Sequence, residues 1–238
     1  MIDVRDLTKK FPGVLAVDRV SFATGTGEVF GLLGPNGAGK TTTLRMILSI
    51  LKPTSGDILV DGISVSRDPL AVRQRIGSVL EDNGVYDRFS AEENVALFGE
   101  FYGMSREAVR TRIAELFKSL EMEEFAKRRA GTLSKGMKQK IAIARALIAD
   151  PPVLIMDEPT AGLDVPTQRM ILDLLKTARS RGKSILYSTH IMSEAEELCD
   201  RVAIIDHGRI RAVGTPKSLK EQTAQANLGD VFMRLLAE

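Results

Sequence analysis

A glycine-rich segment, Gly34-Pro35-Asn36-Gly37-Ala38-Gly39-Lys40-Thr41, carries the most specific chemistry in this sequence. Two glycines are separated by four residues and followed by lysine and threonine, which is the pattern of a phosphate-binding loop. The glycines allow backbone N–H groups to converge on a phosphate, the lysine reaches the β- and γ-phosphates, and the threonine hydroxyl can ligate Mg²⁺. A glycine turn that merely starts a helix would not need the lysine–threonine pair, so the segment predicts a triphosphate site.

The residues around this loop have the structure that such a site requires. The apolar run Val29–Leu33 predicts a buried strand, and apolar residues recur at helical spacing through 42–51. A loop between a strand and a helix presents the helix N-terminus, with its positive dipole end, to a bound phosphate.

Two carboxylates, Asp157 and Glu158, follow a second apolar run at 153–156. Asp157 suits the Mg²⁺ shell, usually through water, and Glu158 is then placed to polarise a water molecule against the γ-phosphate. Solvated loop residues would explain two acids at a strand end equally well. The phosphate loop upstream favours the catalytic interpretation.

The segment 132–140 precedes an apolar helix at 141–148. Ser134 has the character of an N-cap, and Gly136 leaves nearby backbone N–H groups open, which predicts a second anion-binding helix end. Taken alone, ordinary helix capping is the simpler interpretation.

Composition narrows the class of protein. The chain has 238 residues, 44% hydrophobic content and a formal net charge of +2, which predicts one globular domain, with or without a subdomain, and no nucleic-acid partner. Its single cysteine, Cys199, excludes an intrachain disulfide and fits a reducing compartment. Charged residues interrupt any N-terminal signal peptide, and the apolar runs at 29–34 and 141–149 are too short to span a membrane, so we expect any span to come from another chain.

The order of predicted elements indicates an α/β fold. Strands at 2–7, 17–23 and 57–60 form an antiparallel piece, and another strand covers 76–80. A helical insert follows over 90–120, opened by a capping box of Ser90 and Glu93. Strands and helices then alternate, which predicts a parallel sheet with helices on its faces. These elements are strand 153–157, helix 167–180, strand 184–188, helix 193–199, strand 202–206 and a helix at about 217–222 capped by Thr215 and Pro216.

Six motifs, which occur along the chain in the family's order, resemble the nucleotide-binding subunit of ATP-binding cassette (ABC) transporters over nearly the whole chain. Residues 34–41 resemble the Walker A motif, 154–157 the Walker B core, 133–137 the signature (usually Leu-Ser-Gly-Gly-Gln) and 161–164 the D-loop. His190, after a strand, resembles the switch histidine, and Phe11 stands where an aromatic ring stacks on adenine.

The resemblance implies a P-loop NTPase fold of the ABC ATPase type that uses ATP and Mg²⁺. It divides the chain into a RecA-like core with an antiparallel β piece (about 1–80 and 150–222), a helical subdomain (about 85–150) and a C-terminal helix (about 223–238). It implies catalytic roles for Lys40, Glu158 and His190, and Mg²⁺ contacts from Thr41, Glu81 and Asp157. The implied ATP contacts are Phe11, Gly34, Pro35, Asn36, Gly37, Ala38, Gly39, Lys40, Thr41, Thr42, Ser134, Gly136 and Asp164.

The resemblance also implies partners. Two copies are expected to meet head to tail with ATP between the Walker A motif of one and the signature of the other. A separate integral membrane permease is expected to contact a groove near residues 81–100, which places the chain at the cytoplasmic face of the membrane.

Within the family, 85–90, 134–140 and 190–196 are similar to the NatA-type sodium-export ATPases of the ABC-2 exporter group. Drug or lipid-linked cargo remains an alternative, because the permease chooses the cargo. An ABC ATPase that clamps ribosomes or DNA is a second alternative, although such proteins usually carry two cassettes or a long coiled-coil insertion. A regulator that binds nucleotide without turnover is disfavoured by Glu158 and His190.

Three positions depart from the family pattern. Lys135 and Met137 replace the first glycine and the glutamine of the signature, while Ser134 and Gly136 are retained. Glu81 stands where the family's Q-loop glutamine is expected. A carboxylate can still ligate Mg²⁺ but adds negative charge near the γ-phosphate. Glu81 is therefore either a neutral variant or a change in metal demand or coupling.

The second interpretation predicts that Glu81→Gln changes the Mg²⁺ dependence of ATP hydrolysis, because the substitution removes that charge. A Mg²⁺ titration of the steady-state rate, in wild type and variant at equal ATP concentration, measures the change. Superimposable titration curves would leave Glu81 as a neutral variant.

Overall fold

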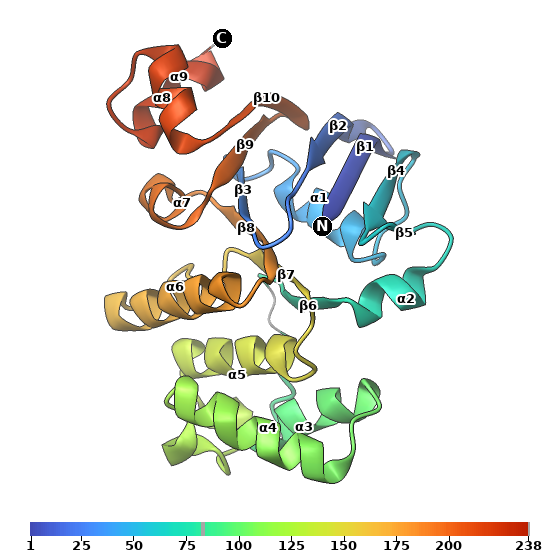
Figure 1. The fold of residues 1–238 in the computed structure, drawn as a ribbon, viewed down its shortest axis with the longest axis vertical. Coiled ribbons are helices and arrows are strands. Elements are labelled where there is room, and N and C mark those ends of the chain that lie inside the picture. Colours follow the sequence, from blue (N-terminus) through green and yellow to red (C-terminus); the bar gives the residue numbers. More distant parts are fainter. Residues whose placement is uncertain (82–83, 238) are drawn as a thin grey trace.

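The computed structural model describes residues 1–81 and 84–237, which form two sheets and their covering helices (Figure 1). A four-stranded antiparallel sheet has the order β2-β1-β4-β5, and a six-stranded sheet has the order β10-β9-β3-β8-β7-β6. In the larger sheet only β10 runs antiparallel to its neighbour. The strands are β1 (Ile2–Phe11), β2 (Val14–Ala23), β3 (Val29–Leu33), β4 (Ser55–Val60), β5 (Ile63–Ser64), β6 (Ile76–Val79), β7 (Val153–Asp157), β8 (Ser184–Thr189), β9 (Arg201–Asp206) and β10 (Arg209–Gly214).

Helices connect the strands and cover the sheets. They are α1 (Lys40–Ile47), α2 (Pro69–Gln74), α3 (Ala91–Phe101), α4 (Arg106–Ser119), α5 (Lys135–Leu147), α6 (Val165–Ser180), α7 (Met192–Leu198), α8 (Pro216–Thr223) and α9 (Leu228–Ala237), with short 3₁₀ turns at Glu123–Phe125 and Ala130–Thr132. This arrangement confirms the predicted α/β class, including the antiparallel piece formed by β1, β2 and β4.

Several boundaries differ from the sequence-based prediction for local reasons. The predicted helical stretch 90–120 is two helices, because Gly103 adopts φ 72° and Ser105 caps a new helix by accepting from the Ala108 N–H. Helix α6 begins two residues earlier than expected, directly after its cap Asp164. The short elements β5, α2 and β10 were not predicted.

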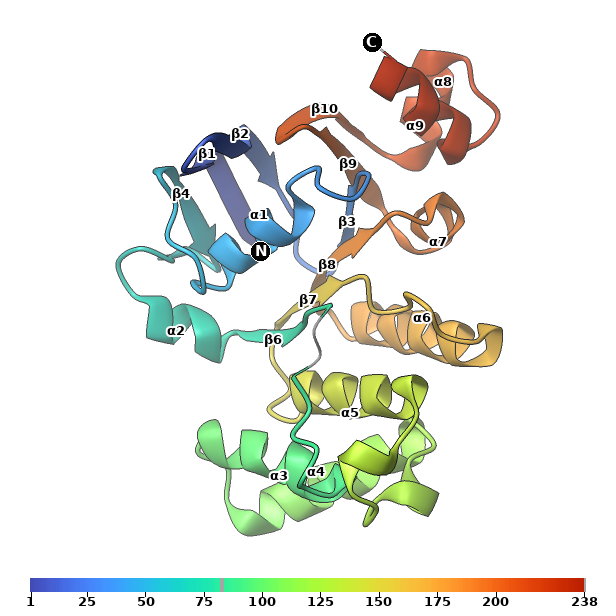
Figure 2. The same ribbon diagram turned by 180° about the vertical axis from the view of Figure 1, so that it is seen from behind.

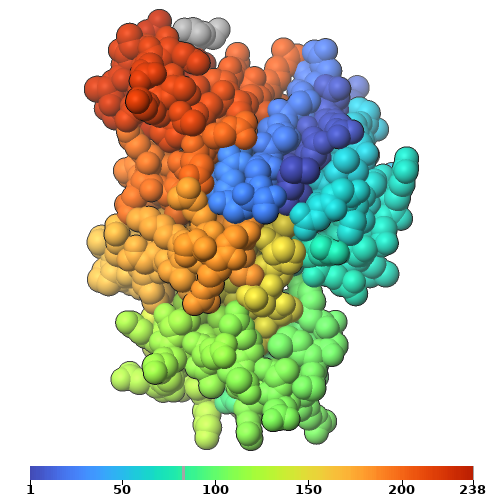
Figure 3. All heavy atoms as spheres, viewed as in Figure 1, coloured from blue at the N-terminus to red at the C-terminus, as the bar shows by residue number. Residues whose placement is uncertain are grey.

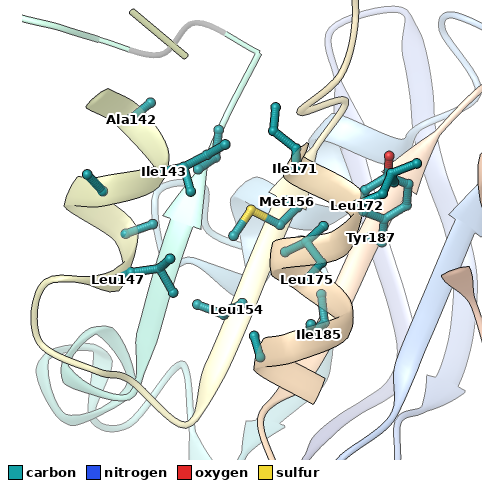
Figure 4. Packing of buried hydrophobic residues seen from close by; sticks show 14 of the residues in the cluster. Ala142, Ile143, Leu147, Leu154, Met156, Ile171, Leu172, Leu175, Ile185 and Tyr187 are labelled. Atoms are coloured by element: carbon teal, nitrogen blue, oxygen red, sulfur yellow. The ribbon is translucent and has the colours of Figure 1, made fainter. Parts of the chain in front are cut away.

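The central strands are buried on both faces, and alternate side chains enter two separate hydrophobic clusters. In β7, Leu154 and Met156 join the cluster that contains α5 and α6, while Val153 and Ile155 join the cluster that contains α1 and the antiparallel sheet. Figure 4 shows Met156 among side chains of α5 and α6. The stacked rings of Phe22 and Phe30, with centroids 5.2 Å apart, join the two sheets. Continuous apolar runs are expected for parallel strands covered on both sides.

The helices α3, α4 and α5 lie together at the end of the molecule opposite α8 and α9, as views from both sides show (Figures 1 and 2). The predicted capping box is confirmed, because the Ser90 hydroxyl accepts from the Glu93 N–H and the Glu93 carboxylate accepts from the Ser90 N–H. In the space-filling view the residues of α8 and α9 occupy one end of the surface (Figure 3). None of the described helices combines the length and apolar character required to span a bilayer.

Helix α5 rests directly on strand β6 at Gly77. A Cβ atom at this position would lie 2.0 Å from the Ala146 carbonyl oxygen and 2.9 Å from its carbonyl carbon. The Cβ would also lie 2.8 Å from Pro151 Cγ, but the closest atom belongs to the α5 backbone and cannot move aside as a flexible side chain would. Glycine is therefore required here for the helix to meet the sheet.

Gly77→Ala is expected to lower the free energy of unfolding by about 2 kcal/mol or more, because overpacking forces backbone shifts. Chemical denaturation measures this loss. Gly229→Ala is the matched control, since its Cβ would meet only the Asn227 side chain, at 3.1 Å. Equal stability of both variants and wild type would contradict the close α5–β6 contact.

Candidate functional site

The parallel register brings the predicted chemistry to one edge of the larger sheet. Leu33 at the end of β3 is paired with Thr189 at the end of β8, and Asp157 at the end of β7 is paired with Ser188. Asp157 is the last residue of β7, and the phosphate loop, Glu158 and His190 directly follow the ends of β3, β7 and β8. Residues from four separate parts of the sequence therefore meet, once Glu81 after β6 is included.

Close backbone contacts shape the loop at 34–41. A Cβ at Gly34 would lie 2.3 Å from the Ile205 carbonyl oxygen, and one at Gly39 would lie 2.6 Å from the Ala16 carbonyl oxygen. Gly37 and Gly39 have φ values of 82° and 104°, in the region that favours glycine. These glycines are thus needed for the loop's path as well as for access to a phosphate.

Lys40 lies inside the loop, with only 4% of the residue exposed. Its ammonium donates to the carbonyl oxygens of Gly34, at 2.7 Å, and Pro35, at 3.1 Å. The Glu158 carboxylate is 3.4 Å away. A buried cation held by two neutral carbonyls and one carboxylate is suited to receive an anionic phosphate.

Thr41 and Asp157 form the second part of the site. The Thr41 hydroxyl donates to Asp157 Oδ2 at 2.8 Å, while the buried Oδ1 of Asp157 has no hydrogen-bond partner. Burial raises the pKa of Asp157, and the Thr41 hydrogen bond partly opposes this shift. A nearby divalent cation would favour the ionised carboxylate in the same way.

This arrangement fits Mg²⁺. Among the described residues, no three His, Cys, Asp or Glu side chains gather to hold a metal by themselves. Mg²⁺, however, is usually bound by one or two carboxylates together with substrate phosphates and water. The unpartnered Asp157 oxygen beside the Thr41 hydroxyl matches that requirement.

Glu158 and His190 form a pair at the mouth of the site. Glu158 Oε2 lies 3.0 Å from His190 Nδ1, and its other oxygen faces Lys40. Glu158 has φ 48°, which is unusual for a residue other than glycine, and its N–H donates to the Ser188 carbonyl at 2.9 Å. The imidazole is 46% exposed, whereas the glutamate side chain is 13% exposed. The pair can therefore bind and orient a water molecule from the open side.

A cavity of about 360 Å³ lies beside the phosphate loop, Lys40, Thr41 and Glu158. Glu81 is among the lining residues and therefore lies near the phosphate loop. The lining residues are Ala16, Asn36, Gly37, Gly39, Lys40, Thr41, Thr42, Glu81 and Glu158.

Nine predicted site residues do not line this cavity, namely Phe11, Gly34, Pro35, Ala38, Ser134, Gly136, Asp157, Asp164 and His190. Four of these, Phe11, Ser134, Gly136 and Asp164, belong to other parts of the chain than the loops described above. Phe11 ends β1, is 38% exposed, and has the Lys9 ammonium 5.1 Å from its ring centroid. Ser134 caps α5 by accepting from the Met137 N–H at 3.2 Å. Asp164 caps α6 through the Thr167 N–H and hydroxyl, which lower the pKa of Asp164. Gly136 lies near Asp164, and both it and Ser134 are outside the cavity.

A group of buried polar residues behind the Glu158–His190 pair was not predicted from the sequence. Glu194 and Thr160 are buried and hydrogen-bonded to each other at 2.9 Å. Tyr187 and Thr189 in β8 also contact Glu194. Their only sequence signal is an acidic residue at helical position 194, four residues after His190, and this is indistinguishable from an exposed helical glutamate.

The chain is similar to known proteins in both sequence and structure. A family model described as ABC transporter matches residues 17–161. The chain is 43% identical to the ABC transporter ATP-binding protein NatA of Bacillus subtilis (strain 168), covering 99% of this chain and 98% of the relative. It is 41% identical to the Nod factor export ATP-binding protein I of Burkholderia orbicola (strain AU 1054), covering 97% of this chain and 76% of the relative.

Two solved structures share the fold. The ATP-binding subunit of an ABC transporter superposes with a TM-score of 0.92 at 31% identity, covering 99% of both chains. A dimeric ATP-binding cassette in a post-hydrolysis state, bound to ADP and Pi, has a TM-score of 0.84 at 31% identity, covering 90% of this chain and 98% of that one.

The phosphate loop, the sheet order and the converging carboxylates define a P-loop nucleotide hydrolase. More specifically, the chain belongs to the ABC transporter family, as an ATP-binding subunit that hydrolyses ATP. This confirms the predicted family, the predicted use of ATP and the predicted ATPase activity.

Lys40→Ala is expected to weaken ATP binding by about a hundredfold or more, because one charged hydrogen-bond donor to phosphate is worth about 3 kcal/mol. Isothermal titration calorimetry with ATP and Mg²⁺ measures the affinity. Lys118→Ala, which removes an exposed lysine of α4, controls for the loss of charge. Near-wild-type affinity of the Lys40 variant would contradict its assignment to the phosphate site.

Proposed function

We propose that two copies of this chain bind ATP head to tail, and that their closure and reopening drive a membrane transporter. In each copy the 34–41 loop and Thr42 bind the phosphates, Lys40 contacts the β- and γ-phosphates, and Phe11 stacks on adenine. Thr41, Asp157 and Glu81 would hold Mg²⁺, which supplies charge neutralisation when bound. Glu158 orients and polarises the attacking water, and His190 holds Glu158 and the γ-phosphate.

The observation that carries this proposal is that the phosphate loop and the N-terminus of α5, the two predicted anion-binding sites, are separate within one chain. None of the described residues that line the phosphate cavity comes from 133–137. Ser134 is exposed at the N-terminus of α5, whose first turn contains no acidic residue. A helix N-terminus favours an anion, and a second copy can bring a triphosphate to it. In that arrangement Ser134, Gly136 and Asp164 contact the nucleotide bound by the partner.

A hollow of about 520 Å³ supports docking of a permease near residues 81–100. Arg88, Glu92, Glu93 and Arg129 line it, and the exposed rings of Tyr86 and Phe89 lie beside each other with centroids 5.7 Å apart. Paired exposed aromatic rings and charged side chains are typical of protein interfaces. Asp82 and Asn83, in the same predicted groove, lie outside the described residues. We place the chain at the cytoplasmic face of the membrane, held there by the permease.

The relatives support a proposal for the direction of transport, and the resemblance to NatA-type proteins supports a first cargo to test. The chain is similar to an export ATPase over 97% of its length and to NatA over 99%. We therefore propose export, with sodium as the first cargo to test, because residues 85–90, 134–140 and 190–196 resemble NatA-type sodium exporters. In this scheme residues 85–150 act as a helical subdomain that couples the permease to the nucleotide.

Glu158→Gln is expected to form a stable dimer with ATP and Mg²⁺, because the amide preserves shape but cannot activate water. Gel filtration with light scattering measures the mass with ATP, with ADP, and without nucleotide. Adding Ser134→Arg to this variant places a bulky side chain at the proposed contact and is expected to restore the monomer. A Glu158→Gln protein that stays monomeric in saturating ATP and Mg²⁺ would count against the head-to-tail arrangement.

A further inference from the structure

A buried polar cluster lies behind the proposed catalytic pair. Its members are Thr160, Tyr187, Thr189 and Glu194, which we call the Glu194 cluster, and each is no more than 7% exposed. Glu194 Oε2 accepts hydrogen bonds from the Tyr187 hydroxyl at 2.7 Å, the Thr160 hydroxyl at 2.9 Å and the Thr189 hydroxyl at 3.3 Å. Buried polar groups are costly unless they are paired, and here one carboxylate oxygen satisfies three donors.

Members of the cluster are close neighbours in sequence of both residues of the catalytic pair. Thr160 is two residues after Glu158, and Thr189 is directly before His190. The Thr189 hydroxyl oxygen also accepts from the Ile191 N–H at 3.0 Å. The residues before and after His190 are therefore linked through one side chain that is itself held by Glu194.

The loop after Glu158 is fixed from two further directions. The Gln139 side chain of α5 donates to the Pro159 carbonyl at 2.8 Å, and Gln168 of α6 donates to the Thr160 carbonyl at 3.3 Å. Burial raises the pKa of Tyr187 far above its ordinary value, so the hydroxyl remains a proton donor to Glu194. Its ring packs in the main core, beside Leu172 in Figure 4.

Glu158 needs such support because of its backbone. A residue other than glycine in the left-handed region costs about 1–3 kcal/mol and persists only when its surroundings hold it there. With φ at 48°, the two carboxylate oxygens of Glu158 lie 3.4 Å from Lys40 Nζ and 3.0 Å from His190 Nδ1. Releasing Thr160 would allow the loop to relax and the glutamate–histidine distance to change.

We propose that Glu194 is a positioning residue for ATP hydrolysis. Through the hydroxyls of Thr160, Tyr187 and Thr189 it fixes the position of Glu158 relative to His190. The proposal rests on the roles proposed above for Glu158 and His190. No member of the cluster lines the phosphate cavity in the described part of the chain. Loss of the cluster should therefore slow the chemical step and leave ATP binding unchanged.

The first experiment compares Tyr187→Phe and Glu194→Gln with Glu196→Gln in the full chain. Glu196 is on the same helix α7, but its carboxylate contacts Lys220 and the Leu228 N–H of the C-terminal helices instead. The cluster variants are expected to lose about tenfold or more in kcat, since small misplacements of reacting groups have effects of this size. Their KM for ATP and their calorimetric ATP affinity should stay within about twofold of wild type.

Tyr187→Phe retains the buried ring and keeps the test valid should Glu194→Gln fail to fold. Wild-type kcat in Tyr187→Phe and in any folded Glu194→Gln protein would overturn the proposal. An equal kcat loss in Glu196→Gln would also overturn it, because the effect would then be general to α7. A rise in KM with unchanged kcat would assign the cluster to nucleotide binding instead.

A double-mutant cycle with His190→Ala separates positioning from general destabilisation. If Glu194 acts through the catalytic pair, Glu194→Gln or Tyr187→Phe combined with His190→Ala should lose less kcat than the product of the single losses, because the share of the effect that acts through His190 is already gone. Fully multiplicative losses in kcat would contradict coupling between the cluster and His190. Normal turnover of His190→Ala alone would contradict the proposed role of His190, and with it the His190 part of this proposal.

Discussion

Parallel hydrogen bonding among β3, β8 and β7 is the constraint on which the whole site depends. Parallel strands end at the same edge of a sheet, so the pairing of Leu33 with Thr189 and of Asp157 with Ser188 aligns three loops at once. A slip of one residue in either pair would turn alternate side chains to the opposite face. The tight contacts between Lys40, Glu158 and His190 are a result of that register.

Burial makes this register unambiguous. Both faces of β7 are covered, one by α5 and α6 and the other by α1 and the antiparallel sheet, and each face has its own hydrophobic cluster. The polar groups in this dry region include the hydrogen-bonded members of the Glu194 cluster and Asp157 Oδ1, which a ligand can complete. The structure therefore distinguishes polar groups that organise the protein from polar groups directed toward a ligand.

Much of the fold and site could be predicted because their signals are local. The phosphate loop has a fixed spacing, Ser90 and Ser134 are recognisable caps, and strand Val29–Leu33 is an uninterrupted apolar run. The elements that were missed, such as β5 and β10, are short, or are stabilised by a neighbouring strand more than by their own pattern. Glu194 could not be predicted, because only the folded chain brings Thr160, Tyr187 and Thr189 around it. Glu81 and Thr41 line one cavity, and their proximity was predicted through the family resemblance and not from a local pattern.

The close contact between Gly77 and the carbonyl of Ala146 provides a point around which α5 could tilt. The helix touches the sheet without an intervening side chain near its C-terminal end, while Ser134 stands at the opposite end. Those two points are separated by about 18 Å at 1.5 Å per residue. A tilt of about 10° around the contact would carry the Ser134 hydroxyl by about 3 Å, which is one hydrogen-bond length on the same scale. A small tilt of helix α5 would thus be sufficient to make or break a hydrogen bond at its N-terminus.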